Sequence, residues 1–119
     1  MHKIRRIDVS RSKELFEEIN GFVNILTSHI DIKKVYLFGS VAHDDFNEGS
    51  DIDLAIIGDF KERFLNRPGR ILEMTELPIE PLCYTKMEFE KTKRKGNPFI
   101  KEILKGKLLY SAKDDTDIG

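Results

Sequence analysis

The residues best suited to chemistry are a glycine–serine pair, Gly39 and Ser40, and two aspartates, Asp51 and Asp53, separated from it by ten residues. Glycine allows a tight turn with close backbone approach, and free N–H groups at a helix start, with a serine hydroxyl, can hold a phosphate. Carboxylates two positions apart on a strand share one face and repel each other. Mg²⁺ relieves that repulsion and completes its coordination with substrate phosphates. The stretch therefore predicts a metal and phosphate site.

Glu80 is a third carboxylate that a neighbouring strand could add. It alternates with apolar positions in residues 79–84, which we interpret as a strand. If that strand pairs beside Asp51 and Asp53, about 4.8 Å away, Glu80 joins their cluster. Three carboxylates and a phosphate-binding turn outline a two-metal phosphoryl-transfer site, in which Glu80 would bind the catalytic ion, assist deprotonation of the acceptor, or both. The alternative without chemistry is that Glu80 is a solvated strand residue. Gly39-Ser40 would then be an ordinary turn, and the aspartates an acidic pair at the start of a strand.

Strands and helices alternate around these residues. Apolar periodicity predicts a helix over residues 10–29 and strands over 34–38, 52–57, 79–84 and 107–111. Residues 60–76 predict a short helix broken at Pro68-Gly69. A capping box at Thr85 predicts a helix to about Lys95, and Asn97-Pro98 starts another that ends near Gly106. We therefore expect an α/β (α+β) fold with a mixed sheet of about four strands flanked by helices.

The composition narrows the class of protein. With 119 residues we expect one domain over residues 1–111 and a frayed polar tail over 112–119. One cysteine, Cys83, excludes an internal disulfide and cysteine-based zinc sites. No apolar run reaches the roughly 18 residues of a membrane span, and the start of the chain does not have the pattern of a secretory signal. We expect a cytoplasmic protein.

The net charge is only −1, but the charges are unevenly distributed. Residues 44–53 hold five acidic side chains and no basic one, whereas residues 86–107 hold eight basic and three acidic side chains. The acidic stretch favours nearby cations. The basic stretch is either a solvated face or a surface that meets phosphates.

Taken together, Phe38-Gly39-Ser40, ten residues and Asp51-Ile52-Asp53 resemble the signature of the DNA polymerase β-type nucleotidyltransferase superfamily. The short chain is similar to its minimal nucleotidyltransferase (MNT) family. The resemblance covers about residues 35–91. It implies a nucleotidyltransferase fold, with Asp51, Asp53 and Glu80 as the catalytic, metal-binding carboxylates and Gly39 and Ser40 as the phosphate-binding pair.

The resemblance also implies an activity and a partner. Members transfer a nucleoside monophosphate, here AMP from ATP, to a hydroxyl group with the help of two Mg²⁺ ions. Short members often act beside a helical HEPN-type protein as toxin–antitoxin couples, in which the transferase attaches AMP to a tyrosine of its partner. We therefore expect the acceptor surface to come from another chain.

One departure from the family concerns positive charge. Many relatives read Gly-Ser-Arg-Ala-Arg-Gly where this chain has Val41, His43 and Asp44 in place of the two arginines and the glycine. Arg63, Arg67 or Arg70 would be substitutes for matching the triphosphate charge.

The missing arginines motivate a second hypothesis, in which the chain is a catalytically weak or inactive module that neutralises a helical partner by contact. A weaker third one is a nucleic-acid end-transferase that uses the basic residues 91–107 on phosphates. The nearly balanced net charge argues against nucleic acid as a partner, so we favour the enzyme acting on a protein hydroxyl.

Overall fold

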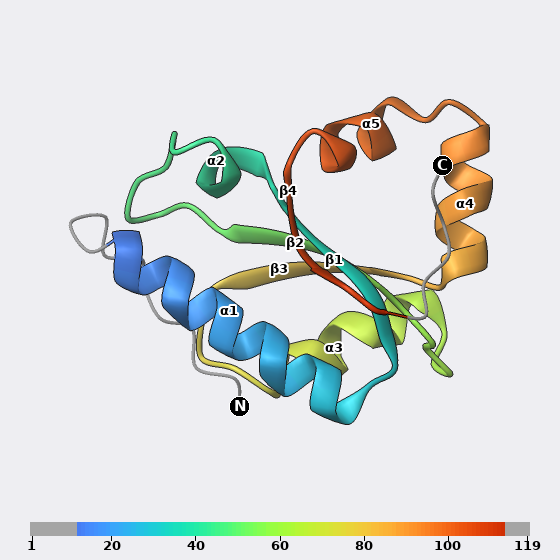
Figure 1. The fold of residues 1–119 in the computed structure, drawn as a ribbon, viewed down its shortest axis with the longest axis horizontal. Helices are drawn as coiled ribbons and strands as arrows, with labels where there is room; N and C mark the ends of the chain where they lie inside the picture. Colours follow the sequence, from blue (N-terminus) through green and yellow to red (C-terminus); the bar gives the residue numbers. More distant parts are fainter. Residues whose placement is uncertain (1–11, 114–119) are drawn as a thin grey trace.

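The computed structural model describes residues 12–113, which form four strands and six helical segments (Figure 1). The strands are β1 (Ile32–Phe38), β2 (Ile52–Gly58), β3 (Ile79–Tyr84) and β4 (Lys107–Ser111). The helices are α1 (Ser12–His29), α2 (Gly39–Ala42), the 3₁₀ turn η2 (Phe64–Asn66), α3 (Arg67–Leu72), α4 (Lys86–Arg94) and α5 (Pro98–Leu104). Residues 1–11 and 114–119, which include most of the expected tail, lie outside the described part.

The strands form one mixed sheet in the order β3-β2-β1-β4, which confirms the predicted class. β1 pairs antiparallel with both β2 and β4, and β2 pairs in parallel with β3. A parallel pair needs a crossover connection, and η2 and α3 lie within the one between β2 and β3. The end of β1 and the starts of β2 and β3 consequently lie together along one edge of the sheet, the edge where these three strands begin or end (Figure 1).

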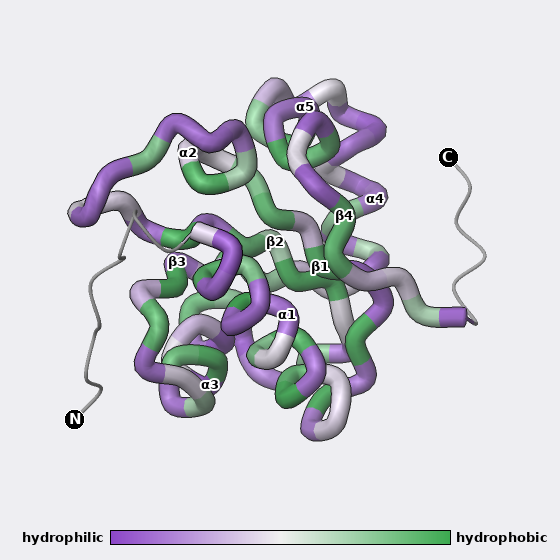
Figure 2. Tube along the Cα trace, turned by 60° about the vertical axis from the view of Figure 1, so that its left-hand side comes forward, coloured by the Kyte–Doolittle hydropathy of each residue, from purple (hydrophilic) through white to green (hydrophobic). Residues whose placement is uncertain are grey.

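Two apolar clusters cover the two faces of the sheet (Figure 2). On one face, α1 and Ile71 of α3 pack against Leu54 and Ile56 of β2. On the other face, α4 and α5 pack against Ala55 and Ile57 of the same strand. β2 is therefore buried on both sides, as expected for a central strand with helices on each face.

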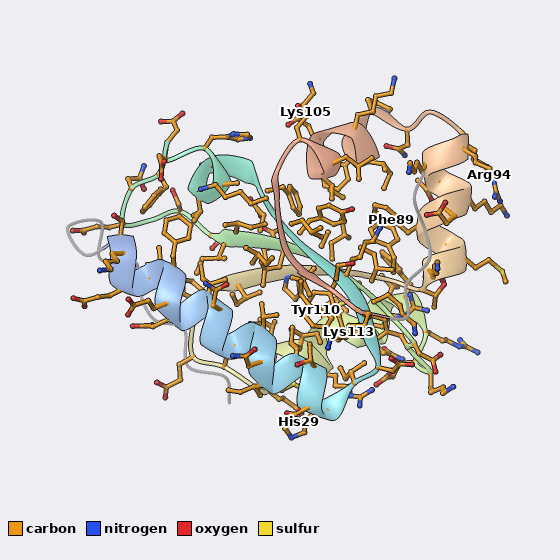
Figure 3. All side chains as sticks on the ribbon, in the orientation of Figure 1. His29, Phe89, Arg94, Lys105, Tyr110 and Lys113 are labelled. Carbon is orange, nitrogen blue, oxygen red and sulfur yellow. The ribbon has the colours of Figure 1, made fainter. Side chains whose placement is uncertain are left out.

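Local signals place the helices that follow β3. Thr85 forms a capping box with Glu88, and the Asn97 side chain accepts a hydrogen bond from the backbone N–H of Phe99. Both confirm the predicted helix starts. Phe89 reaches from α4 toward the sheet, whereas Arg94 at the end of α4 and Lys105 directly after α5 point outward (Figure 3).

The expected helix break at Pro68-Gly69 was wrong. Pro68 and Gly69 lie in the first turn of α3, where a missing backbone N–H costs nothing because those groups have no partner within the helix. The irregular segment instead precedes the proline, at the 3₁₀ turn η2. Among the described residues, no helix combines the length and the apolar character needed to cross a bilayer.

Candidate active site

Asp53 and Glu80 stand side by side at the shared edge of the sheet. The parallel pairing of β2 with β3 sets Asp53 opposite Glu80, and the antiparallel pairing of β1 with β2 sets Phe38 opposite Asp53. The residues across the sheet at this level are therefore Phe38, Asp53 and Glu80. The pairing of residues 79–84 beside Asp53, the condition for Glu80 to join the aspartates, is thus present.

Of the three carboxyl groups at this edge, Asp53 has a pKa that is clearly raised. Partial burial, then the charge of Glu80 and a hydrogen bond with the Glu80 side chain, and lastly the charge of Asp51, raise the pKa of Asp53 from 3.8 to about 6. A hydrogen bond between two carboxyl groups requires a proton on one of them. The pair therefore holds negative charge that favours a proton or a cation.

Asp51 is near this pair but does not form a preformed set of three metal ligands with it. It lies just before β2, is exposed, and acts on Asp53 through its charge. Within residues 12–113 no three His, Cys, Asp or Glu side chains are grouped so that they could already hold an ion. The predicted trio thus consists of a contacting pair and a neighbouring third carboxylate.

Gly39 lies directly against Asp53. It has a φ of +75°, in the left-handed region that favours glycine. A Cβ added there would overlap Oδ2 of Asp53. Only a residue without a side chain leaves the carboxylate accessible from this side. Glycine is therefore needed at position 39 both for its backbone conformation and for the space beside Asp53.

Ser40 begins a compact turn beside Gly39. Its carbonyl oxygen accepts hydrogen bonds from the N–H groups of His43 (3.2 Å) and Asp45 (3.0 Å). The turn closes at Asp44, which has a φ of +57°. The ten residues after Ser40 lead to the start of β2, as their spacing predicted, and phosphate binding by Gly39 and Ser40 stays a prediction.

The positions where relatives carry motif arginines do not supply positive charge here. Val41 is fully buried in the core that contains α1, and His43 is exposed at the end of α2. Asp44 occupies the left-handed position, where a glycine would be unstrained. Aspartate is one of the few other residue types that tolerates this conformation.

Arg67 and Arg70, considered as triphosphate ligands, are engaged elsewhere. Arg67 is buried and binds both carboxylate oxygens of Glu88, at 2.6 and 3.2 Å. It also donates a hydrogen bond to the backbone oxygen of Cys83, near the end of β3 that is opposite Glu80. Arg70 pairs with Glu62 at 2.8 Å. Arg67 is a structural clamp between the crossover and α4, which corrects its proposed role as a phosphate ligand.

Beside the carboxylate pair lies a pocket that the sequence did not reveal. Its volume is about 280 Å³. Its lining residues come from β1, β2 and the edge strand β3, and from α5: Phe38, Asp53, Glu80, Pro81, Leu82 and Phe99. Phe99 lies in the first turn of α5 and is 47% exposed, whereas Ile100 and Ile103 of the same helix are buried. In the sequence, only its place in this apolar helix could have indicated that Phe99 lines a pocket.

The chain is similar to several known proteins. The profile of the family described as "Polymerase beta, Nucleotidyltransferase" matches residues 20–115. A Methanocaldococcus jannaschii protein named "Putative protein adenylyltransferase MJ1379" is 29% identical over 97 residues, which are 82% of this chain and 94% of that protein.

Two further matches are narrower or more distant. "Putative protein adenylyltransferase MJ0604" of the same organism is 54% identical over 43 residues, covering 34% of this chain and only 43% of that relative. The crystal structure of a "putative nucleotidyltransferase" from Sulfolobus solfataricus superposes with a TM-score of 0.63 at 16% identity, covering 90% of this chain and 89% of that one. At that identity the superposition shows a common fold.

Proposed function

Because the chain belongs to the polymerase beta nucleotidyltransferase family, we propose that it transfers AMP from ATP to a hydroxyl group of a partner protein. The observation that carries this proposal is the Asp53–Glu80 pair next to Gly39, at one edge of the sheet. The names of the two archaeal relatives favour a protein as the acceptor. We propose a helical HEPN-type protein, with the chain acting as its antitoxin in the cytoplasm.

The carboxylates fit a divalent metal. Asp53 has a raised pKa because Glu80 and Asp51 add negative charge beside a partly buried group, and a cation would remove that penalty. Asp51, Asp53 and Glu80 would hold two Mg²⁺ ions, with substrate phosphates completing the coordination. Bound metal would lower the pKa of the attacking hydroxyl group and neutralise charge on the reacting phosphate.

The residues of this chain would divide the remaining work. Gly39 and Ser40 would bind the β- and γ-phosphates at the turn beside Asp53. The acceptor oxygen would form a bond to the α-phosphorus, and the bond from that phosphorus to the bridging oxygen of the β-phosphate would break. Pyrophosphate leaves, and the hydroxyl proton passes to Glu80 as general base.

A second candidate function is neutralisation of the partner by contact alone. It is favoured by the buried Val41 and by the absence, within residues 12–113, of an assembled three-ligand group. The two functions differ in what the carboxylates do. An Asp51→Asn/Asp53→Asn variant that still neutralises the partner fully would favour contact, whereas a variant that binds without neutralising it would favour catalysis.

The test of the transferase is label transfer. The protein is incubated with Mg²⁺, a candidate HEPN-type partner and ATP labelled on the α-phosphate. We expect label on the partner, lost with Asp53→Asn or Glu80→Gln and kept with the matched control Asp59→Asn, an exposed carboxylate beyond the far end of β2. Label that follows the γ-phosphate, or full transfer by Asp53→Asn, would overturn the proposal.

A further inference from the structure

The outer side of α4 and α5 carries a dense group of basic side chains. Both helices bury their apolar side, which includes Phe89 and Ile103, in the cluster on this face of the sheet. Five exposed bases, here called the basic stripe, follow one another along the two helices: Lys91, Arg94, Lys95, Lys101 and Lys105. Arg94, at the end of α4, and Lys105, directly after α5, both point away from the sheet (Figure 3). The stripe therefore belongs to the outer surface.

Within the stripe, like charges lie one helical turn apart. The backbone N–H of Lys95 donates to the carbonyl oxygen of Lys91, and that of Lys105 donates to Lys101, each at 3.2 Å. Like charges at this spacing repel each other and destabilise a helix. The helix dipole favours bases near a C-terminal end and offsets part of this repulsion. An anionic partner would remove the rest.

The acidic side chains around the stripe neutralise little of its charge. Glu88 is bound to the buried Arg67, and Glu90 is partly buried. Glu102 lies 3.9 Å from Lys105, and both of these side chains are mostly exposed. A long contact between exposed groups is a weak ion pair, so the stripe keeps its excess of positive charge.

Exposed apolar side chains adjoin the stripe at its α5 end. Of the seven large apolar side chains that are exposed within residues 12–113, three lie close together in sequence: Phe99, Leu104 and Leu108. Leu104 directly precedes Lys105 and is 37% exposed. Leu108, 52% exposed, pairs across the sheet with Tyr36, whose ring stacks on Phe89 of α4. Paired residues share a face, so Leu108 lies on the face that α4 and α5 cover.

This combination favours a protein surface over a nucleic acid as the partner. Four of the five bases are lysines, whereas planar, bidentate recognition of phosphate favours arginine. Binding of single strands uses exposed aromatic rings, but Phe99, the ring beside the stripe, already packs against Phe38. Polar groups around exposed apolar side chains are instead the usual composition of a protein interface.

We propose that the basic stripe, together with Leu104 and Leu108, is a docking surface for an acidic surface of a partner protein. That this partner also receives AMP rests on the proposed function, whereas the docking itself does not. Phe99 links the two regions, because it lies in the first turn of α5 and lines the pocket beside Asp53 and Glu80. A protein docked on α5 is thus held beside the candidate active site.

The probe for this surface is a helical peptide that carries glutamates and leucines on one side, titrated at low ionic strength. Amide NMR is expected to show shifts at Lys101 and Leu108. Lys101→Glu/Lys105→Glu should weaken binding by about tenfold or more, because like charges then face each other. Lys13→Glu/Lys61→Glu makes the same change in net charge at exposed positions on other elements and should alter the affinity by less than about twofold.

Two further comparisons identify the chemistry of the partner. A peptide with serines in place of the leucines should bind more weakly, because Leu104 and Leu108 lose their apolar contacts. Single-stranded RNA of equal charge should bind no more tightly than the acidic peptide. Tighter binding of RNA, peptide bound away from the stripe, or equal peptide affinity of wild type and Lys101→Glu/Lys105→Glu would overturn the inference. If that variant does not fold, Lys91→Gln/Lys95→Gln tests the same surface on α4, with a smaller loss expected.

Titration of Mg–ATP separates this inference from the proposed function. Lys101→Glu/Lys105→Glu should bind Mg–ATP as wild type does, because neither lysine lines the pocket beside Asp53 and Glu80. Wild type that binds the peptide at the stripe but no Mg–ATP would support the docking surface and contradict the proposed function. Wild type that binds Mg–ATP but not the peptide would overturn the docking surface alone.

Discussion

The α-carbon of Gly39 faces the carboxylate of Asp53 so closely that a methyl group on Gly39 would overlap Oδ2 of Asp53. The turn after β1 and the acidic start of β2 are thus fitted to each other. Gly39→Ala should lower the free energy of unfolding by about 1–3 kcal/mol, because it adds both a clash and left-handed strain, and should abolish transfer. Denaturant unfolding and label transfer measure the two effects.

Gly21→Ala is the matched control for that substitution. Gly21 lies inside α1, and a Cβ there meets no atom within 4 Å. It should raise stability by up to about 1 kcal/mol and leave transfer unchanged, because alanine is the better helix former. Equal stability of the Gly39→Ala and Gly21→Ala proteins would contradict the claim that Gly39 leaves no room for a side chain beside Asp53.

Asp53 should destabilise the metal-free protein at neutral pH. Its pKa is about 6 when folded and near 3.8 as an ordinary aspartate, so between these values the folded state binds the proton more tightly. Stability therefore falls as pH rises through this window, and the cost is complete above it. Discounted for solvent screening of a half-buried group, the cost is roughly 1–2 kcal/mol.

Asp53→Asn should consequently raise the melting temperature of the metal-free protein at neutral pH and lose this advantage near the acidic end of the window. The same variant should lose transfer activity. Thermal unfolding at both pH values in the presence of a chelator is the measurement. An equal gain at both pH values would show that the carboxylate charge is not the cause.

Glu88 should be essential for stability but not for nucleotide binding. Its carboxylate neutralises the buried Arg67, whose guanidinium also lies over the rings of Phe60 and Phe64. Glu88→Gln should cost about 2–4 kcal/mol, because it leaves a buried cation without its counter-charge. Asp59→Asn, which breaks the exposed pair with Lys61, should cost less than about 1 kcal/mol.

The folded fraction of the Glu88→Gln protein should bind Mg–ATP with unchanged affinity, since Arg67 lies near the end of β3 that is opposite Glu80. Calorimetry at a temperature well below unfolding measures this. A large loss of ATP affinity would return Arg67 to the role of a phosphate ligand.

Asp44 should tolerate glycine and reject β-branched residues. Its φ of +57° is left-handed, where a branched Cβ clashes with the backbone. Asp44→Val should lose about 1–2 kcal/mol, while Asp44→Gly should be at least as stable as wild type. Denaturant midpoints of the two variants decide the matter, and equal midpoints would show that the turn can relax.

Much of this architecture was predictable from local patterns. The alternation of Glu80 with apolar residues predicted which face of the strand it occupies, and the parallel pairing of β2 with β3 then places it opposite Asp53. Four strands and the helix starts at Thr85 and Asn97 follow from periodicity and capping, which depend on neighbours in sequence.

What could not be predicted depends on tertiary contacts. The Arg67–Glu88 pair joins residues 21 positions apart on a crossover and a helix, so no local pattern reveals it. Phe99 lines the pocket beside the carboxylates only because α5 packs over the sheet. Pro68-Gly69 indicates a break when taken alone, but the preceding 3₁₀ turn makes that proline the start of a helix.

The most direct test of the central claim is calorimetric titration of ATP into the wild-type protein and the Asp51→Asn/Asp53→Asn variant, each with Mg²⁺ and with a chelator. The account predicts binding that requires Mg²⁺ and disappears in the variant, because these carboxylates hold the metal that the triphosphate needs. Binding of equal affinity in the variant, or in the absence of metal, would contradict the assignment of Asp51 and Asp53 as its ligands.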